Sequence, residues 1–277
     1  MEFLTQSIFD EGGRRLGGYG RTLVMGILNV TPDSFSDGGR FDSAERAVTH
    51  ALRMVGEGAD ILDIGAESTR PGHQQVEADL EIARLRPVLE ALKGHVNCPI
   101  SVDTTKATVA EAALKVGVTI INDVWGFQKD RALADVVAAY DAGVVLMHNR
   151  EEIDPLIDIM DDMVRFLEVS LAIAVKAGIP TASISLDPGI GFGKTLEQNL
   201  AAIAQLDRLK ALGFPVLVGA SRKSMIGKII ASTTDERLPG TLALHTAAML
   251  RGADIIRVHD VKEAVQAARV TDRLKDI

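Results

Sequence analysis

The stretch VTIIND (118–123) decides the fold, because an unbroken apolar run of strand length ends there in two polar residues. A short run rich in β-branched residues favours a strand. Seven further runs are of the same kind: TLVMGIL (22–28), ADILDIG (59–65), CPISVD (98–103), GVVLMH (143–148), ASISLD (182–187), PVLVGA (215–220) and ADIIRVH (253–259). Unbroken apolar runs, rather than alternating ones, indicate strands covered on both faces, as in a parallel sheet.

A segment with helical periodicity follows each run, and Gly or Pro stands at the junctions. These helices are expected near 43–57, 76–92, 106–116, 130–141, 155–177, 196–211, 240–251 and 261–273. Eight strand-then-helix units predict an α/β fold, an eight-stranded parallel (β/α) TIM barrel. The chain has no linker-like tract, so a single domain over 1–277 is expected. Residues 1–20 lack a strong period and are expected to form an irregular lead-in at the bottom of the barrel.

The composition excludes several classes of protein. The net charge is −8, from 30 Lys and Arg against 38 Asp and Glu, and there is no basic run, so nucleic-acid binding is not expected. No apolar stretch approaches the ~20 residues that cross a bilayer, so no membrane association is expected. The acidic N-terminus MEFLTQSIFDEGG (1–13) lacks a signal-peptide pattern, which indicates a cytoplasmic protein. The single cysteine, Cys98, excludes an intrachain disulfide.

Polar residues stand at the ends of the strands, where TIM barrels carry their active sites. They are Asn29, Asp63, Asp103, Asn122, Asp123, His148, Asp187, Ser221, Arg222, Lys223, Arg257 and His259. Asp103 or Asn122 alone is equally well explained as a helix N-cap. Three acceptors at the same depth, Asp103, Asn122 and Asp187, together favour recognition of the donors on a planar heterocycle.

Five cations fall just past strand ends, namely Arg70, Lys194, Arg222, Lys223 and Arg257. They predict a positively charged barrel mouth in a protein whose net charge is negative, which suits a small phosphorylated ligand. The segment DPGIGFGKT (187–195) invites a phosphate-loop interpretation, but Pro188 stands where that motif needs glycine. Its glycines are compatible with backbone N–H groups approaching an anion, or simply with the end of a strand.

The connections at 29–40 and 66–75 are longer than the usual loop after a barrel strand, and both are rich in turn-forming residues. They are predicted to be mobile active-site loops that exclude water when they close. Neither a paired-histidine motif nor a nucleophile-elbow pentapeptide occurs in the sequence. A transition-metal site and a serine nucleophile are therefore not predicted.

Seven strings in order now resemble the dihydropteroate synthase family of folate biosynthesis: NVTPDSFSDGG (29–39), ESTRPG (67–72), SVDT (101–104), INDV (121–124), DPGIGFGK (187–194), SRKS (221–224) and RVHDV (257–261). The resemblance implies an enzyme that condenses (7,8-dihydropterin-6-yl)methyl diphosphate with p-aminobenzoate, giving 7,8-dihydropteroate and pyrophosphate. It also implies Mg²⁺ as cofactor and a homodimer.

The resemblance implies a set of site residues, each at a position that matches a family string. The pterin diphosphate would contact Thr69, Asp103, Asn122, Asp187, Lys223, Arg257 and His259, and p-aminobenzoate would contact Thr69, Arg70, Pro71, Phe192 and Ser224. The catalytic residues would be Asp103, Lys223, Arg70 and Asp33, and Asn29 would contact the metal ion. The reaction would be a dissociative substitution, in which Asp103 stabilises a cationic methylene carbon.

Two alternatives stay open at the level of the sequence. A pterin-binding barrel of the folate-dependent methyltransferase type would share the Asp and Asn acceptors. A non-catalytic paralogue would bind pterins without turning them over. The segment after the fifth strand, Met147-His148-Asn149-Arg150 followed by the acidic stretch 151–162, departs from the expected family pattern.

Overall fold

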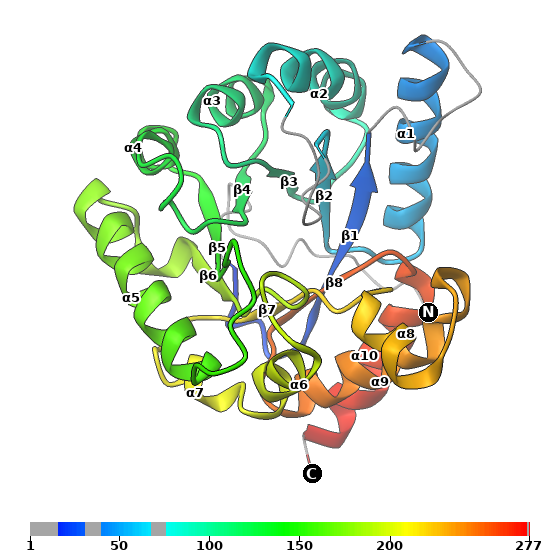
Figure 1. Cartoon of the computed structure of the whole chain (residues 1–277). Helices are drawn as coiled ribbons and strands as arrows, with labels where there is room; N and C mark the ends of the chain where they lie inside the picture. Colours follow the sequence, from blue (N-terminus) through cyan, green and yellow to red (C-terminus); the bar gives the residue numbers. More distant parts are fainter. Residues whose placement is uncertain (1–15, 31–39, 68–75, 276) are drawn as a thin grey trace.

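The computed structural model describes residues 16–30, 40–67, 76–275 and 277, and shows eight parallel strands around one axis (Figure 1). The strands are β1 (Leu23–Asn29), β2 (Ile61–Gly65), β3 (Ile100–Asp103), β4 (Ile120–Asp123), β5 (Gly143–Met147), β6 (Ile184–Asp187), β7 (Leu217–Val218) and β8 (Ile255–Val258). Their order in the sheet, β6-β5-β4-β3-β2-β1-β8-β7, is that of a TIM barrel. The predicted fold class is confirmed.

The sheet closes between β6 and β7 through little backbone pairing. One isolated parallel bridge joins Leu186 to Val216, and the Leu186 N–H donates to the Pro215 carbonyl at 2.9 Å. The run predicted as a strand over 215–220 therefore contributes only two residues to the ladder. Ala220 lies beyond the ladder. Its N–H donates to Nε2 of His245 at 3.1 Å and is not paired with a neighbouring strand.

Helices surround the strands, as predicted (Figure 1). They are α1 (Arg40–Gly56), α2 (Ala78–Leu92), α3 (Ala107–Val116), α4 (Ala132–Ala139), α5 (Ile159–Ala177), α6 (Leu196–Ala204), α7 (Asp207–Lys210), α8 (Ser224–Ile230), α9 (Leu238–Leu250) and α10 (Val261–Lys275). The helix expected over 196–211 is two helices, and α8 was not predicted. In the part of the chain that the structure describes, no helix is both long and apolar enough to cross a membrane.

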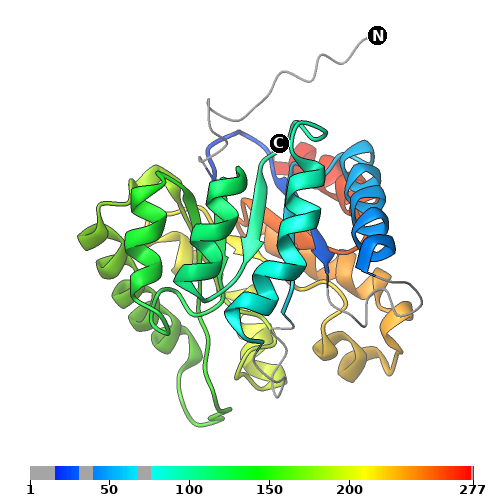
Figure 2. The ribbon, with the colours of Figure 1, turned by 90° about the horizontal axis from the view of Figure 1, so that it is seen from above.

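Two apolar layers hold the barrel together. The larger lies between the sheet and the helices and includes Leu62, Ile121 and Leu186. The smaller fills the barrel interior, and Leu16 packs there with Leu23 and Met25. Residue 16, the first that the structure describes, thus lies at the bottom of the barrel, where the lead-in over 1–20 is expected. Figure 2 shows the strands from the side, with α6, α8 and the connection after β5 at the end to which the strands point.

Candidate active site

Strand register places the predicted acceptors on one rim of the barrel. Asn29 pairs in register with Gly65, Gly65 with Asp103, and Asp103 with Asn122, so these positions form one row across β1 to β4. Asp187 ends β6 at the same edge. The side chains of Asp103, Asn122 and Asp187 are each at most 5% exposed, so they are shielded from bulk solvent.

Arg257 of β8 lies at the centre of this rim. Its Nε donates to Asp63 Oδ2 at 2.6 Å, and its Nη2 donates to Asp103 Oδ2 at 3.1 Å. The same Asp63 oxygen accepts from Nδ2 of Asn122 at 3.1 Å, which fixes the orientation of the Asn122 amide. Oδ1 of Asp103 and Oδ1 of Asn122 are buried and have no hydrogen-bond partner among the described residues. Two acceptors in the site are therefore left for the donors of a ligand.

Asp63 accepts hydrogen bonds from both Arg257 and Asn122 and so orients them. The sequence did not predict this role. The predicted row of polar strand ends includes Asp63, but the residue lies inside β2, in register with Ile27 and Ser101, and gives no local sign of its partners. Arg257 is 194 positions away in the chain. The only available signal was the cost of a fully buried carboxylate, which demands a donor somewhere in the fold.

Burial shifts the titration of the two acidic acceptors upward. Burial raises the pKa of Asp103 to about 7, although Arg257 opposes the shift. Burial likewise raises the pKa of Asp187 to about 6, opposed by the N–H of Gly189 and then by the charge of Lys223. Both carboxylates are therefore poorly solvated and gain from any donor that a ligand brings.

The DPGIGFGKT segment is held by its own side chains. The Gly189 N–H donates to Asp187 Oδ1 at 2.7 Å, and the Gly191 N–H donates to Asn199 Oδ1 at 2.6 Å. The buried Lys194 ammonium donates to the carbonyls of Gly189 at 2.8 Å and Phe192 at 2.9 Å. Because these N–H groups are already bonded, the structure does not support the phosphate-loop interpretation of this segment.

The turn places the ring of Phe192 beside Lys223. Nζ of Lys223 lies 4.4 Å from the centroid of that ring, within the range of a cation–π contact. Phe192 also packs with Val124 and Met147 in a small apolar cluster at the barrel mouth. Ser224, exposed at the start of α8, follows Lys223 directly. An aromatic face, an ammonium and a hydroxyl thus stand close together on this side of the rim.

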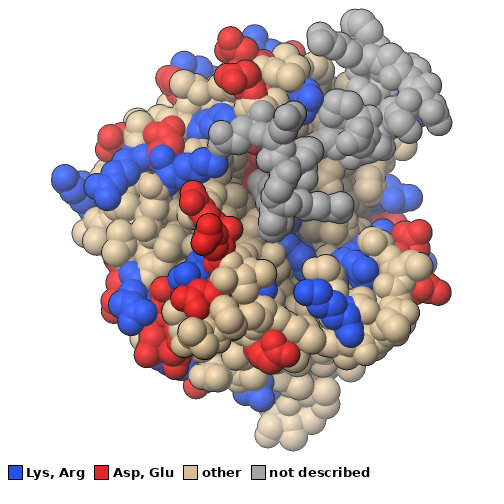
Figure 3. All heavy atoms as spheres, in the orientation of Figure 1, with Lys and Arg blue, Asp and Glu red and all other residues tan. Residues whose placement is uncertain are grey.

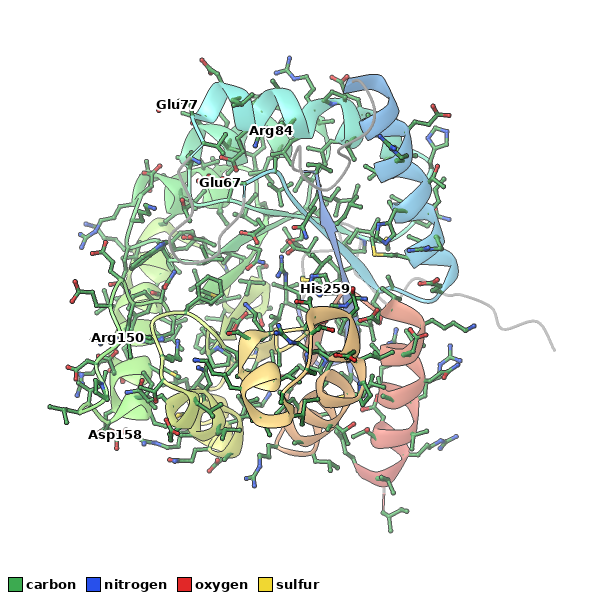
Figure 4. All side chains as sticks on the ribbon, turned by 45° about the vertical axis from the view of Figure 1, so that its right-hand side comes forward. Glu67, Glu77, Arg84, Arg150, Asp158 and His259 are labelled. Atoms are coloured by element: carbon green, nitrogen blue, oxygen red, sulfur yellow. The ribbon has the colours of Figure 1, made fainter. Side chains whose placement is uncertain are left out.

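His259 follows β8 and is bound to the end of β7 (Figure 4). Its backbone N–H donates to Oγ of Ser221 at 3.2 Å, and its Nδ1 lies 2.9 Å from the same oxygen. The serine hydroxyl can donate to Nδ1, and in that tautomer the ring proton lies on Nε2. Burial, with the charges of Arg257 and Arg222, lowers the pKa of His259 to about 4, so the ring is neutral at pH 7.

Residues 25–259 match the family described as "Pterin binding enzyme". The chain is 49% identical to the dihydropteroate synthase of Clostridium beijerinckii, over 91% of this chain and 94% of that protein. The chain belongs to the dihydropteroate synthase family. A solved Xanthomonas albilineans dihydropteroate synthase with 4-aminobenzoic acid has 44% identity and a TM-score of 0.89, covering 93% of this chain and 94% of that one.

A further Xanthomonas albilineans dihydropteroate synthase structure, in complex with 7,8-dihydropteroate, has 42% identity and a TM-score of 0.85, covering 93% of this chain and 95% of that one. The family expected from the seven sequence strings is confirmed. The chain is thus an enzyme, a transferase of this family.

The structure brings together most of the site residues expected for the family. Asp103, Asn122, Asp187, Phe192, Lys223, Ser224, Arg257, His259 and Asn29 stand at the strand ends or in the connections after them. Asp33, Thr69, Arg70 and Pro71 lie outside the described residues, as do most of the two predicted mobile loops.

His148, ambiguous in the sequence, is fully buried, and its Nε2 lies 3.2 Å from Oδ2 of Asp162. Burial lowers its pKa to about 3. Arg150 donates to the same Asp162 oxygen at 2.7 Å. Figure 4 shows Arg150 and Asp158 away from His259, at the outer side of the molecule. In the unusual segment after β5, His148 and Arg150 therefore contact Asp162 of the same segment.

In the described residues, the positive charge predicted for the barrel mouth is largely offset by nearby carboxylates and carbonyls. The guanidinium of Arg222 is paired with Asp260, that of Arg257 with Asp63 and Asp103, and the Lys194 ammonium is held by carbonyls. Carboxylates at the strand ends offset the cations that follow them. Figure 3 shows acidic and basic side chains mixed over this face of the molecule.

Proposed function

We propose that this protein condenses (7,8-dihydropterin-6-yl)methyl diphosphate with p-aminobenzoate and releases 7,8-dihydropteroate and pyrophosphate. The observation that carries the proposal is a pair of buried acceptors without a partner in the described part of the chain, Oδ1 of Asp103 and Oδ1 of Asn122, beside the Asp187 carboxylate. A flat ring with several N–H donors satisfies all three at once. Each unmet buried acceptor otherwise costs about 1–3 kcal/mol.

The pterin ring is bound edge-on by acceptors and by one cation. Asp187 accepts from the 2-amino group and the neighbouring ring N–H, while Asn122 and Asp103 take the remaining donors. Lys223 donates to the ring carbonyl, since its charge already acts on Asp187. The planar guanidinium of Arg257 stacks on the ring, held there by Asp63.

The diphosphate lies between Arg257 and His259. His259 offers its Nε2–H to a phosphate oxygen, because Ser221 occupies Nδ1. As a neutral donor it needs no proton uptake to bind the leaving group. We propose that Arg70, outside the described residues, adds a second positive charge.

Mg²⁺ is proposed as the cofactor, with Asn29 as its contact on this chain. The side chain of Asn29 is exposed at the end of β1, and its Oδ1 faces the space over Gly65, 3.9 Å from where a Cβ would stand. An exposed amide oxygen fits this ion, which usually takes one or two protein ligands beside substrate phosphates and water. Bound there, the ion would neutralise charge that develops on pyrophosphate.

The bond changes require no nucleophile from the protein. The bond between the methylene carbon and the diphosphate oxygen breaks, and the electron pair leaves with pyrophosphate. The cationic methylene carbon is conjugated with the pterin and lies near the Asp103 carboxylate, which stabilises it. The amine of p-aminobenzoate then attacks this carbon and loses a proton.

p-Aminobenzoate enters beside the ring on the Phe192 side. The Phe192 face and Lys223 frame its ring, and Ser224 hydrogen-bonds its carboxylate. Thr69, Arg70 and Pro71 are proposed to complete this pocket. The solved Xanthomonas albilineans relative with 4-aminobenzoic acid supports a pocket of this class.

A coupling assay with purified protein, both substrates, and Mg²⁺ or EDTA tests the proposal. Formation of 7,8-dihydropteroate with Mg²⁺ and strong loss of product with EDTA are expected. Pterin binding without product would favour the non-catalytic paralogue, and methyl transfer from methyltetrahydrofolate would favour the methyltransferase type. Light scattering after gel filtration tests the proposed homodimer. The cytoplasmic location stays a prediction.

A further inference from the structure

The connection from β7 to α8 contains an unusual backbone conformation at Arg222. Its φ angle is 54°, in the left-handed region that a non-glycine residue seldom adopts. Ser221 and Lys223 flank it, and both take part in the candidate active site. A conformation of this kind persists only where surrounding contacts impose it.

Two side chains near the start of α9 hold the backbone of Arg222. Its N–H donates to Oγ1 of Thr241 at 3.0 Å, and its carbonyl accepts from Nη1 of Arg237 at 3.0 Å. Thr241 is buried, so this bond is shielded from water. The backbone on both sides of the turn is thereby fixed relative to the helix.

The Arg222 side chain reaches across to the residue after His259. Its Nε donates to Asp260 Oδ2 at 3.0 Å, and its Nη2 donates to Asp260 Oδ1 at 2.5 Å. Such a two-bond pair fixes direction as well as distance. A second link, from Ser221 Oγ to His259, joins the same two connections. The segment with Lys223 and the segment with His259 are therefore tied together twice.

We propose that Arg222 and Asp260 are positioning residues that set the spacing between Lys223 and His259. The inference rests on the proposed function, in which Lys223 binds the pterin ring and His259 the diphosphate attached to it. A single substrate molecule must bind to both residues. The distance between Lys223 and His259 therefore has to match the distance between the ring carbonyl and the phosphates of the substrate. Small errors in such a distance cost rate steeply.

A direct contact between Arg222 and the diphosphate is the competing explanation, and Asp260→Asn separates the two. If Asp260 positions the segment through Arg222, its loss displaces the neighbouring His259, which weakens pyrophosphate binding and lowers turnover. If Arg222 binds the anion itself, the loss of a competing carboxylate strengthens pyrophosphate binding. The two explanations thus predict changes of opposite sign.

The experiment compares Asp260→Asn, Arg222→Gly and the double variant with the unmodified enzyme. Glycine adopts a φ of 54° without strain, so Arg222→Gly removes the ion pair but keeps the turn. We expect kcat to fall about tenfold in each single variant, with pyrophosphate binding weakened by a similar factor. Affinity for a pterin without the diphosphate should stay within about twofold, because the ring contacts remain. The double variant should be no worse than the singles, as expected for two residues that act as one unit.

Arg21 and Asp60 provide the matched control. They form the same two-bond pair at the opposite end of the barrel, with distances of 3.0 and 2.6 Å. Arg21→Lys should leave kcat unchanged, while Arg222→Lys, which keeps the charge but not the two-bond geometry, should lower it. The inference is overturned if Asp260→Asn keeps kcat within twofold or binds pyrophosphate more tightly. An unmodified enzyme without coupling activity would instead refute the proposed function, and the pyrophosphate measurements would still test the pair.

Discussion

At the scale of single residues, the candidate site concentrates polar groups whose hydrogen-bonding capacity is only partly used. Oδ2 of Asp103 accepts from Arg257, whereas Oδ1 has no partner within the residues that the structure describes. The guanidinium compensates the buried charge, so the fold tolerates an acceptor that is available to a ligand. The same residue is thereby suited to meet positive charge that appears during the reaction.

Asp103→Asn is expected to lower kcat about a hundredfold, because the amide keeps the shape but cannot stabilise a cationic methylene carbon. Pterin affinity should fall by less than tenfold, since the amide oxygen still accepts one hydrogen bond. Steady-state kinetics and calorimetric titration with the pterin measure the two effects. Equal losses in kcat and in affinity would contradict the proposed role of Asp103.

Pterin affinity is expected to rise with pH through the range in which Asp187 and Asp103 ionise. Burial raises the pKa of Asp187 to about 6 and that of Asp103 to about 7. Because these values exceed those of an unfolded chain, both groups stabilise the fold most when protonated, and this contribution declines as pH rises toward 7. Binding has the opposite sign, since ring donors need the charged carboxylates.

Calorimetric titration of a pterin between pH 5 and 8 checks this expectation. Affinity should increase with pH and level off toward about pH 8, one unit above the pKa of Asp103. Asp187→Asn should bind weakly and lose the lower part of the dependence. A flat profile for the unmodified enzyme would show that neither carboxylate titrates in this range.

At the scale of elements, the turn after β6 joins Asp187 to Phe192 at the candidate site. Gly189 has a φ of 65°, and a Cβ there would stand 1.9 Å from the carbonyl oxygen of His148. That oxygen belongs to the backbone after β5, so no side-chain rotation relieves the clash. The close approach of these two connections keeps Asp187 and Phe192 on opposite sides of one short turn.

Gly189→Ala is expected to destabilise the fold by about 3 kcal/mol, the sum of a left-handed backbone penalty and a steric clash. Gly178→Ala is the matched control, because its φ is 86° but nothing lies within 4 Å of the added carbon. That variant should lose only about 1 kcal/mol. Urea unfolding of both variants measures the difference, and equal losses would show that the contact with His148 is unimportant.

Elements that bury a continuous apolar run were predictable, and short or distant contacts were not. The strand ending in Asn122 and Asp123 follows from local pattern alone. Helix α8 is seven residues long, too short to show a period, and it packs through Met225 and Ile226. The partner of Asp63 could not be inferred, because an ion pair between β2 and β8, far apart in the chain, leaves no mark on the neighbouring sequence. The strand ends thus indicated where the candidate site lies but not how its charges are paired.

At the scale of the whole molecule, the apolar residues that stabilise the barrel interior and the polar residues of the candidate site lie at opposite ends of the barrel. The interior near the bottom is apolar and contains Leu16, Leu23 and Met25. The rim above it holds the carboxylates and Arg257. In TIM barrels the face at the start of the strands serves stability, which leaves the opposite face available for catalytic groups.

Leu16→Ala is expected to cost about 2–5 kcal/mol of unfolding free energy, because the side chain is fully buried in the barrel interior and its loss leaves a cavity. Its kcat at 25 °C should stay within about twofold of the unmodified enzyme, since the contacts of Leu16 lie away from the rim. Leu156→Ala, at a side chain that is 93% exposed, is the control and should change stability by less than about 0.5 kcal/mol. Urea unfolding and the coupling assay on the same preparations measure both quantities. A large loss of kcat in folded Leu16→Ala would show that the bottom of the barrel also shapes the site.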